Sequence, residues 1–392
     1  MKQSFDNTEV AFASKSDKDL RWTYRMFKAF GKNWLVNLGD FGQKIAFALR
    51  LPIKGIIKRT IFKQFCGGET IDECEPRIKE LEQYNVGAIL DYSVEGKYKE
   101  DDLDEIRDEI IATIHKARDF ENIPFAVFKP TGICRTGLLE KVNVSEEKLN
   151  AAEKIEWEAV KNRFEAICKA AYEAGVPVFI DAEDSWFQDA IDQLAEEMML
   201  KYNQERGIVY NTLQMYRHDR LDFLHRSHKH AQENGYILGI KLVRGAYMEK
   251  ERERAREMEY EDPIQPNREA THTDFNSAML YMIQHIDQIH FCAGTHNEYS
   301  CMLLADLLEQ YNLKRGDKRV YFAQLLGMSD HISFNLSEEG YNVVKYVPYG
   351  PVKEVMPYLM RRAKENTSVA GQMSRELSLI VKEMERRKIM EN

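Results

Sequence analysis

Residues 236–245, with the sequence YILGIKLVRG, form a nearly unbroken apolar run that ends in an arginine and a glycine. A continuous apolar run of this length is typical of a parallel strand that is covered on both faces. The runs PFAVFKP at 124–130 and PVFIDAED at 177–184 are also continuously apolar, and each has a charged end. The sequence therefore predicts a buried parallel sheet.

Eight strand-like runs follow one another from Val86 onward, and most are followed by a longer, charged stretch with helical spacing. The strands are expected at Val86–Ser93, Pro124–Pro130, Pro177–Asp184, Ile208–Tyr216, Ile237–Gly245, Gln288–Asn297, Arg319–Met328 and Asn342–Gly350. The helices between them are expected at Asp101–Phe120, Ser145–Ala174, Gln188–Glu205, Asp219–Asn234, Thr273–Asp287, Tyr299–Tyr311 and Pro351–Asn366. Strands that alternate with helices predict a parallel sheet, and eight such units favour an α/β fold of the TIM type, a (β/α)8 barrel. An open doubly wound sheet is the alternative, but no GxGxxG follows the first strand.

The first 85 residues show helical spacing without strand signals. Helices are expected at Arg21–Phe47, Lys54–Phe65 and Thr70–Tyr84, and Thr70 with Glu73 has the spacing of a capping box. We therefore predict an N-terminal helical segment, 1–85, and a barrel domain, 86–392, which ends in a helix over 375–392.

Composition narrows the class of protein. The net charge of −9, with basic and acidic residues interspersed, argues against a nucleic-acid partner. No apolar run reaches the roughly 20 residues that span a bilayer, and the acidic N-terminal segment resembles neither a secretory signal nor a mitochondrial presequence. These features predict a cytoplasmic enzyme. The six cysteines form no CxxC pair and are expected to be reduced thiols.

The predicted fold indicates where chemistry would occur, because active sites of (β/α)8 barrels lie at the C-terminal ends of the strands. Polar side chains stand at the ends of six predicted strands: Lys129, Asp181, Gln214, Lys241, Arg244, Thr295, His296, Asn297 and Tyr346. Together with Arg361 and Arg362 of the last predicted helix, the lysines and Arg244 predict a positive potential and an anionic ligand, either a carboxylate, a diphosphate or both.

The last predicted helix carries an adjacent arginine pair. Arg362 and Glu365 share one helix face, whereas Arg361 points about 100° away. The planar fork of an arginine suits bidentate carboxylate binding. The pair therefore predicts a site that holds a small carboxylate from two sides, although a solvated ion pair of Arg362 with Glu365 is the simpler alternative.

Three segments resemble those of proline dehydrogenases. They are KYVPYGPVKEVMPYLMRRAKEN at 345–366, KLVRGAY at 241–247 and FIDAED at 179–184, and they occur in the order typical of that family. The resemblance extends over the barrel and is nearer to the eukaryotic-style, monofunctional branch than to the long bifunctional bacterial enzymes. It implies a distorted barrel that binds FAD at its C-terminal mouth and oxidises L-proline to Δ1-pyrroline-5-carboxylate, with hydride transfer to the flavin and electrons passing on to a quinone-type acceptor.

The resemblance also assigns roles to individual residues. It implies a catalytic set of Lys129, Asp181 and Lys241, in which Asp181 lies behind Lys129. It implies a proline pocket formed by Lys129, Tyr247, Leu325, Tyr346, Arg361 and Arg362. It implies FAD contacts from Gln214, Lys241, Val243, Arg244, Gly245, Ala246, Thr295, His296, Asn297 and Glu365. Lys241 departs from the bifunctional enzymes, which have arginine there, so it keeps the charge near the flavin but loses the fork of donors.

Four alternatives are weighed against this hypothesis. A Schiff-base aldolase would use Lys129 or Lys241. A metal-dependent hydrolase would need a ligand motif, and the histidines show none; those at 225, 228 and 230 are expected on a solvated helix face. A binding protein that has lost activity is disfavoured by the retained cations. A trans-4-hydroxyproline dehydrogenase is disfavoured by Tyr346, which would exclude a ring hydroxyl.

Two further expectations concern partners. The C-terminal helix is a candidate for peripheral membrane contact, although packing on the barrel is the commoner role of such a helix. The chain is short for a fused aldehyde dehydrogenase, so a separate pyrroline-5-carboxylate dehydrogenase is expected to take the product.

Overall fold

The computed structural model describes residues 4–30, 54–93, 100–368 and 370–390, although not the side chains of Phe30, Asp101 and residues 364–374. The chain divides into two compact units. One comprises residues 1–88 and 324–392, and the other comprises residues 89–323.

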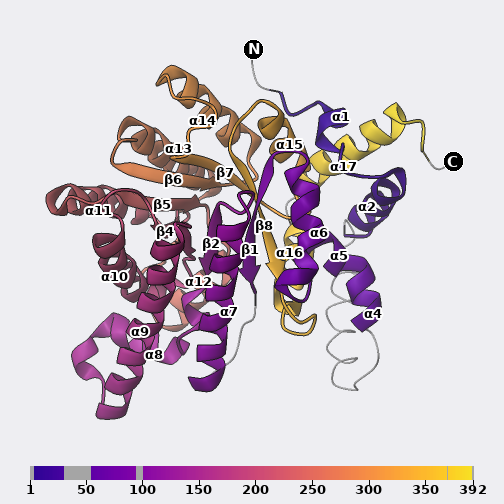
Figure 1. The fold of residues 1–392 in the computed structure, drawn as a ribbon. Helices are drawn as coiled ribbons and strands as arrows, with labels where there is room; N and C mark the ends of the chain where they lie inside the picture. Colours follow the sequence, from indigo (N-terminus) through magenta and orange to yellow (C-terminus); the bar gives the residue numbers. More distant parts are fainter. Residues whose placement is uncertain (1–3, 31–53, 94–99, 369, 391–392) are drawn as a thin grey trace. The chain divides into compact units, whose positions relative to one another are not determined.

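Eight parallel strands form a closed barrel in which they follow one another in sequence order (Figure 1). Their bounds are β1 Val86–Tyr92, β2 Phe125–Phe128, β3 Val178–Ile180, β4 Val209–Gln214, β5 Leu238–Val243, β6 Ile289–Gly294, β7 Val320–Leu325 and β8 Val343–Tyr349. Each strand lies within its predicted range, and the prediction of a (β/α)8 barrel is confirmed.

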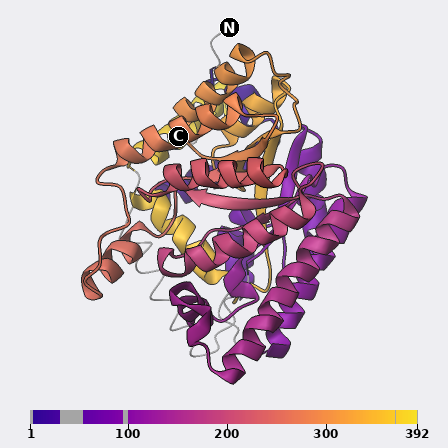
Figure 2. The ribbon, with the colours of Figure 1, turned by 90° about the vertical axis from the view of Figure 1, so that its left-hand side faces the viewer.

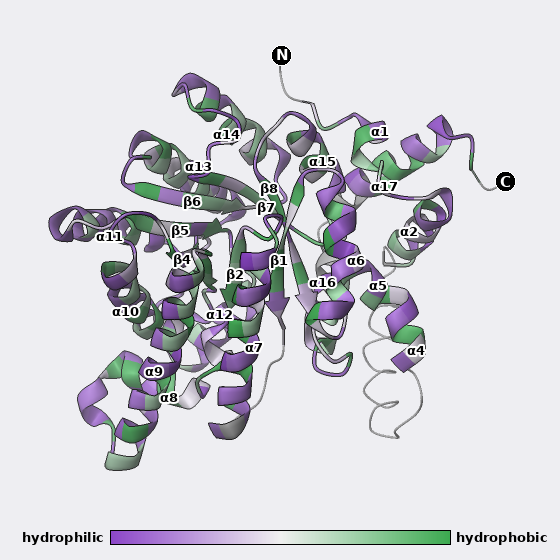
Figure 3. Ribbon diagram, in the orientation of Figure 1, coloured by the Kyte–Doolittle hydropathy of each residue, from purple (hydrophilic) through white to green (hydrophobic). Residues whose placement is uncertain are grey.

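The continuous apolar runs became strands because both of their faces are covered. The four residues of β2 and the six of β4 are all buried. In Figure 3 the strands are mostly hydrophobic, whereas the helices carry hydrophobic and hydrophilic bands. That pattern is the one expected where helices cover the outside of a parallel sheet.

Eight helices lie in the described residues of the unit 89–323. They are α7 Glu100–Asp119, α8 Thr136–Val144, α9 Ala151–Ala174, α10 Ser185–Tyr202, α11 Arg220–Asn234, α12 Met248–Glu257, α13 Arg268–Gln284 and α14 Glu298–Gln310, with short 3-10 turns at η2 Pro130–Gly132 and η3 Glu146–Lys148. The long helices α7 and α9 lie side by side (Figure 2). Helices α8 and α12 were not predicted.

One predicted helix begins later than expected. The prediction placed its start at Ser145, but α9 begins at Ala151, where Asn150 and Glu153 form a capping box. A capping box satisfies two otherwise unpaired backbone N–H groups at a helix start. The residues before it, Glu146–Lys148, form a separate 3-10 turn.

The other unit contains the remaining helices of the described residues. They are α1 Thr8–Ala11, α2 Asp17–Phe30, α4 Lys54–Ile57, the π-helical turn η1 Lys58–Phe62, α5 Lys63–Phe65, α6 Ile71–Glu82, α15 Asp330–Glu338, α16 Met356–Ser368 and α17 Ala370–Arg386. The Thr70 side chain accepts a hydrogen bond from the Glu73 N–H at the start of α6, which is one half of the predicted capping box. The Glu73 carboxylate accepts instead from the Glu69 N–H at 3.1 Å. The predicted helix Arg21–Phe47 runs into residues 31–53, outside the described residues, and α1 and α15 were not predicted.

The C-terminal helix α17 contributes its apolar side chains to the core of its own unit. Leu379, Ile380 and Met384 are buried there, in a cluster that also contains Phe27 of α2 and Leu359 of α16. The candidate apolar surface for membrane contact is therefore covered by protein. No helix within the described residues combines the length and hydropathy needed to cross a bilayer.

Aromatic side chains fill part of the barrel interior. Phe125 of β2 stacks on Phe179 of β3 at 4.3 Å between ring centroids and meets Tyr321 of β7 edge-on at 4.8 Å. Since β2 and β7 are not neighbours, the second contact must run through the interior. Gly239 of β5 leaves the space for the Tyr210 ring, because a Cβ there would lie 2.9 Å from that ring and 2.2 Å from a backbone oxygen.

Candidate active site

Two lysines and two aspartates form a chain of charges beyond this aromatic layer. Side chains two residues apart on a strand share a face, so Lys129 and Asp181 stand on the same faces as Phe125 and Phe179. The Lys129 Nζ donates to both oxygens of Asp91, at 2.8 and 2.9 Å, and lies 3.7 Å from Asp181. Lys241 pairs with the other oxygen of Asp181. Their side chains are between 6% and 15% exposed, so the four charges are largely shielded from water.

Asp91, at the end of β1, was not predicted as a site residue. Burial by itself would raise the pKa of its carboxyl, but the charge and hydrogen bonds of Lys129 outweigh that effect and hold the pKa below its usual range. The Ser93 hydroxyl also donates to Asp91, at 2.7 Å. Asp91, rather than the predicted Asp181, is thus the close partner of Lys129, and Asp181 bridges the two lysines.

These pairs change one expectation. Lys129 and Lys241 were expected to give the barrel mouth a positive potential, but Asp91 and Asp181 offset both charges. The prediction counted cations at strand ends and did not include the aspartate that ends the first strand.

Glu183 ties the turn after Lys129 to the end of β3. Its carboxylate accepts hydrogen bonds from the backbone N–H and the hydroxyl of Thr131, at 2.8 and 2.5 Å. Burial raises the pKa of Glu183 to about 7. The side-chain amide of Gln214, at the end of β4, donates to the Glu183 carbonyl at 2.6 Å. Gln214, a predicted FAD contact, therefore has one donor already engaged in holding this turn.

Arg244 forms a second cluster at the end of β5. Its guanidinium donates to His272 Nδ1 at 2.8 Å, to the Thr295 hydroxyl at 2.7 Å and to the Ser300 hydroxyl at 2.8 Å. No carboxylate within the part of the chain that the structure describes pairs with it, and burial lowers the pKa of Arg244 to about 10. An arginine with neutral partners retains its positive charge for an anionic ligand.

Arg244 lies at the N-terminus of α14. Asn297 caps this helix by accepting from the Ser300 N–H at 2.9 Å, and the Asn297 N–H in turn donates to Thr295 at 3.1 Å. A helix N-terminus beside an arginine favours negative charge. The structure thus brings together the predicted residues Arg244, Thr295 and Asn297, and adds His272 and Ser300, which no spacing in the sequence indicated.

Gly245 allows the chain to turn directly after Arg244. Its φ of +124° lies in a region that L-residues rarely adopt, and an added Cβ would lie 2.5 Å from the ring of Tyr216. Val243 is the last residue of β5, Ala246 is exposed, and Tyr247 caps α12. His296 lies in the loop between β6 and α14. All of these predicted FAD or substrate contacts lie in the unit 89–323.

The remaining predicted site residues lie in the other unit. Leu325 is at the end of β7, and the Leu326 N–H donates to the carbonyl of the buried Tyr346 at 2.9 Å. Arg361 and Arg362 lie on α16, where the Arg362 guanidinium is 5.3 Å from the ring centroid of Tyr358. The Glu365 side chain lies outside the described residues.

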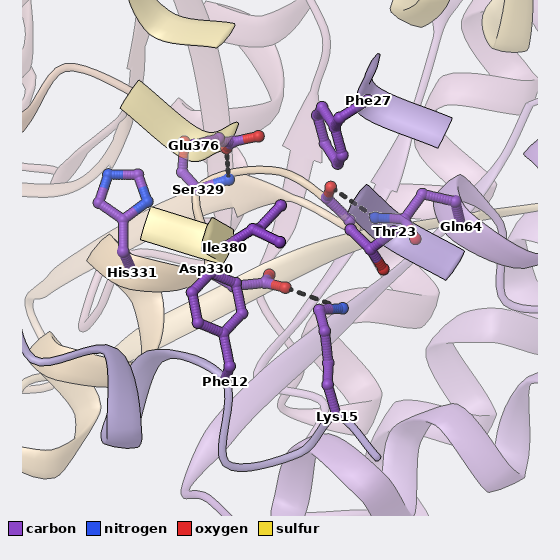
Figure 4. A pocket seen from close by; sticks show the side chains of 11 residues that line it. Phe12, Lys15, Thr23, Phe27, Gln64, Ser329, Asp330, His331, Glu376 and Ile380 are labelled. Carbon is purple, nitrogen blue, oxygen red and sulfur yellow. Dashed lines mark hydrogen bonds and ion pairs between the residues drawn. The ribbon is translucent and has the colours of Figure 1, made fainter. Parts of the chain in front are cut away.

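A small cavity with a mixed polar and apolar lining lies in that unit beside the loop from β7 to α15 (Figure 4). Glu376 of α17 accepts from the Ser329 N–H, and Ser329 has a left-handed φ of +51°. Lys345 of β8 donates to the Met328 carbonyl at 2.5 Å and pairs with Asp330 at 3.0 Å. The cavity has a volume of about 10 Å³, which is room for about one water molecule. The cluster therefore supports the loop rather than forming a ligand site.

The histidines differ from the prediction in one respect. His225 is exposed, as expected, but His228 is buried and bonded to Tyr281 and Gln288, each at 2.7 Å. Burial is also the main reason that the pKa of His228 lies below its usual value. Its buried side faces α13, which the composition of one helix could not indicate. Within the described residues no group of three or more His, Cys, Asp or Glu is arranged to hold a metal, and the six cysteines are buried and form no disulfide.

Comparison with known proteins places the chain in a family. A family model described as proline dehydrogenase matches residues 74–375. Proline dehydrogenase 1, mitochondrial, of Dictyostelium discoideum is 33% identical over 429 residues, which cover 97% of this chain and 74% of that protein. The chain belongs to the proline dehydrogenase family. The predicted family and enzyme class, proline dehydrogenase, are confirmed.

Two other matches define how far the similarity extends. Human proline dehydrogenase 1, mitochondrial, is 41% identical over 256 residues, covering 64% of this chain and 42% of that protein. The crystal structure of proline utilization A from Bdellovibrio bacteriovorus superposes with a TM-score of 0.73 at 19% identity, covering 94% of this chain and 38% of that one. The second match shows a shared fold, and the chain spans about two fifths of the length of these two proteins.

The expectation of a cytoplasmic location is wrong by the same comparison. The Dictyostelium, human and Arabidopsis thaliana relatives are all named mitochondrial proline dehydrogenases. The expectation rested on the charge of one terminal segment, which says little about the compartment in which a folded barrel works.

Proposed function

We propose that the chain is a flavoenzyme that oxidises L-proline to Δ1-pyrroline-5-carboxylate. The observation that carries the proposal is Arg244, a half-buried cation held by three neutral partners at the N-terminus of α14. Such a site fits the diphosphate of FAD, because the arginine fork and the helix terminus both favour phosphate oxygens. Membership of the proline dehydrogenase family supports the substrate.

The residues that would hold FAD are those around this arginine. Arg244, Thr295 and Asn297 would bind the diphosphate, and Gly245 would allow the backbone to approach it closely. Gln214, Val243, Ala246, His296 and Glu365 complete the proposed set. FAD, when bound, supplies the acceptor for the hydride that leaves C5 of proline. Lys241, which pairs with Asp181, would lie beside the flavin as a hydrogen-bond donor.

A second set of residues would hold proline. Lys129, Arg361 and Arg362 would bind the carboxylate, and Tyr247, Leu325 and Tyr346 would form the walls around the ring. Fixing both ends of a small substrate lowers the entropy cost of reaching the transition state. The amine would release a proton to solvent and C5 would give up a hydride, so that a C=N bond forms between them. Asp91 and Asp181 would orient Lys129 and Lys241 through their ion pairs.

Two reactions by other molecules complete the proposal. Electrons leave for a quinone-type acceptor, and a pyrroline-5-carboxylate dehydrogenase consumes the product. The absorption spectrum of the purified protein before and after anaerobic addition of L-proline tests the core of this proposal. We expect a flavin spectrum that bleaches on addition of proline. A colourless protein, or a flavin that proline does not reduce, would contradict the proposal, and trapping of substrate on Lys129 or Lys241 by borohydride would indicate an aldolase instead.

Trans-4-hydroxyproline is the second candidate substrate. Tyr346 favours proline, because the family resemblance implies that a tyrosine at this position excludes a ring hydroxyl, and Tyr346 is buried. We expect kcat/KM to be higher for L-proline than for trans-4-hydroxyproline. The reverse order would reassign the substrate and leave the cofactor proposal intact.

A further inference from the structure

Glu251 is a buried carboxylate in the most highly charged segment of the unit 89–323. Helix α12 has the sequence MEKERERARE, and most of its charged side chains are solvent-accessible, but the Glu251 residue is 0% exposed. Its partners are the backbone N–H of Ser185 at 2.7 Å, the hydroxyl of Ser185, and the hydroxyl of Tyr216 at 3.5 Å. Within the described residues no lysine or arginine forms an ion pair with it.

Burying a carboxylate without an ion pair is costly, and burial is the main reason that the pKa of Glu251 is raised. A neutral side chain of similar size would fill the same space at lower cost in desolvation. The position therefore points to a use for the carboxylate beyond packing.

The hydrogen-bond partners of Glu251 indicate a role in connecting loops. Ser185 follows directly on the segment Asp181–Asp184 at the end of β3, and Tyr216 follows β4. Tyr216 also donates its backbone N–H to the Arg244 carbonyl at 2.7 Å and packs against Gly245. Helix α12 begins immediately after Tyr247, so Glu251 links the loops that follow three consecutive strands, β3, β4 and β5.

Other contacts of α12 with the β3 side are weaker anchors. Lys250 pairs with Asp184 at 2.6 Å, but its side chain is 59% exposed. Arg254 lies 4.3 Å from the ring of Trp186. An exposed ion pair contributes little to stability, whereas removing the acceptor from buried N–H and O–H donors leaves them unsatisfied. Glu251 is thus the contact that fixes the loop from Arg244 to Tyr247 against β3.

We propose that Glu251 is a positioning residue, whose carboxylate holds the Arg244–Tyr247 loop in the conformation that binds the flavin. The inference rests on the proposed function for the identity of the ligand. The link between the loops is independent of the proposed function, because the hydrogen bonds between Glu251 and Ser185 define it.

The first test is hydrogen–deuterium exchange of the flavin-free chain in three forms: wild type, Glu251→Ala and Glu253→Ala. Glu253 is exposed on the same helix and is the matched control. We expect Glu251→Ala to speed exchange by about tenfold or more in two segments at once, 182–188 and 244–257, with α9 unchanged. Exchange at the wild-type rate in both segments, or a uniform increase that includes α9, would overturn the proposal.

The second test is the dissociation constant for FAD, measured by flavin fluorescence. We expect Glu251→Ala to weaken binding by about tenfold, and Glu253→Ala to have no effect. Glu251→Gln keeps one acceptor oxygen for the Ser185 N–H, so it should recover most of the affinity. Equal affinity of all three variants and the wild type would overturn the inference. If the wild type binds no FAD, the proposed function fails, and the exchange measurement still decides whether Glu251 couples the two loops.

Discussion

The pair of Lys129 and Asp91 sets the local electrostatics at the barrel centre. Asp91 is 6% exposed in its side chain and meets the lysine with both oxygens. A buried pair of this kind stabilises the fold only while both partners are present, because either charge alone would remain desolvated and uncompensated.

Lys129→Met is therefore expected to destabilise the chain by about 3–5 kcal/mol at neutral pH. This loss in the free energy of unfolding should be smaller at low pH. The lysine lowers the pKa of Asp91 in the folded state, so its stabilisation is present above the usual pKa of about 3.9 and is lost as pH falls through the folded value. Urea unfolding at pH 7 and pH 3 measures both effects, because the stabilisation is lost only below the unfolded pKa of about 3.9. The double variant Asp91→Asn, Lys129→Met is the control and should recover much of the loss, and a single variant as stable as the wild type would contradict this account.

Gly245 illustrates a backbone requirement at the same scale. Gly245→Ala is expected to destabilise by about 1–3 kcal/mol, because alanine tolerates the φ of +124° poorly and its Cβ would meet the Tyr216 ring. Gly137 in α8 is the matched control, since a Cβ there meets nothing within 4 Å. Gly137→Ala should be neutral or stabilising by up to about 1 kcal/mol. Thermal unfolding measures the stability of both variants. Equal changes in stability for Gly245→Ala and Gly137→Ala would contradict this account.

The sequence indicated part of the site and missed its partners for a physical reason. Lys129, Lys241 and Arg244 were found because a charge at the end of an apolar run is conspicuous. Asp91 lies 38 residues from its partner Lys129, and Glu251 lies 66 residues from Ser185. Contacts of that separation depend on which strand ends meet in space, and no local spacing reports them.

Among the elements, strands were easier to predict than short helices. All eight strands lie within their predicted ranges because strands covered on both faces are continuously apolar. Helices α8, α12 and α15 were missed because they are short and their burial is set by tertiary contacts. In α15 most residues are buried on all sides, including Ser333 and Asn335, so no polar face marks the helix in the sequence.

Helix α17 carries a prediction at this scale. Burial raises the pKa of Glu376, which lies near His331, Asp330 and Lys345, so its ionisation opposes folding as pH rises through the folded pKa. Glu376→Gln removes that cost while leaving an oxygen to accept from Ser329. We expect the stability difference between variant and wild type to shift in favour of the variant from pH 4.5 to pH 8, as measured by denaturant unfolding. A difference that is independent of pH would show that Glu376 is not the titrating group.

For the whole molecule, net charge is a poor guide to ligand charge. The chain carries −9 overall, and two of the cations expected to attract an anion are already paired with aspartates. Among the described residues no carboxylate pairs with Arg244, so its charge is not offset. Arg244 belongs to the cluster that we assign to FAD.

Binding of FAD should therefore stabilise the molecule as a whole. At a free FAD concentration of 100 times the dissociation constant, linkage predicts about 2.7 kcal/mol of added stability and a rise of several degrees in Tm. Arg244→Met should abolish most of this rise and leave the Tm without FAD within a few degrees of wild type. Calorimetry of the wild type and of Arg244→Met, each with and without FAD, tests this prediction. An equal rise in Tm for the two proteins would mean that FAD binds elsewhere.

The aromatic layer formed by Phe125, Phe179, Tyr210 and Tyr321 has a consequence for ionic strength. It closes one side of the lysine–aspartate chain, whose side chains are at most 15% exposed. Dissolved ions screen charges that they can surround, and buried pairs escape most of that screening. The rate constant for flavin reduction by saturating proline should therefore change less than about twofold between roughly 0.05 and 0.5 M salt. A steep dependence in stopped-flow measurements would mean that solvent ions reach these charges.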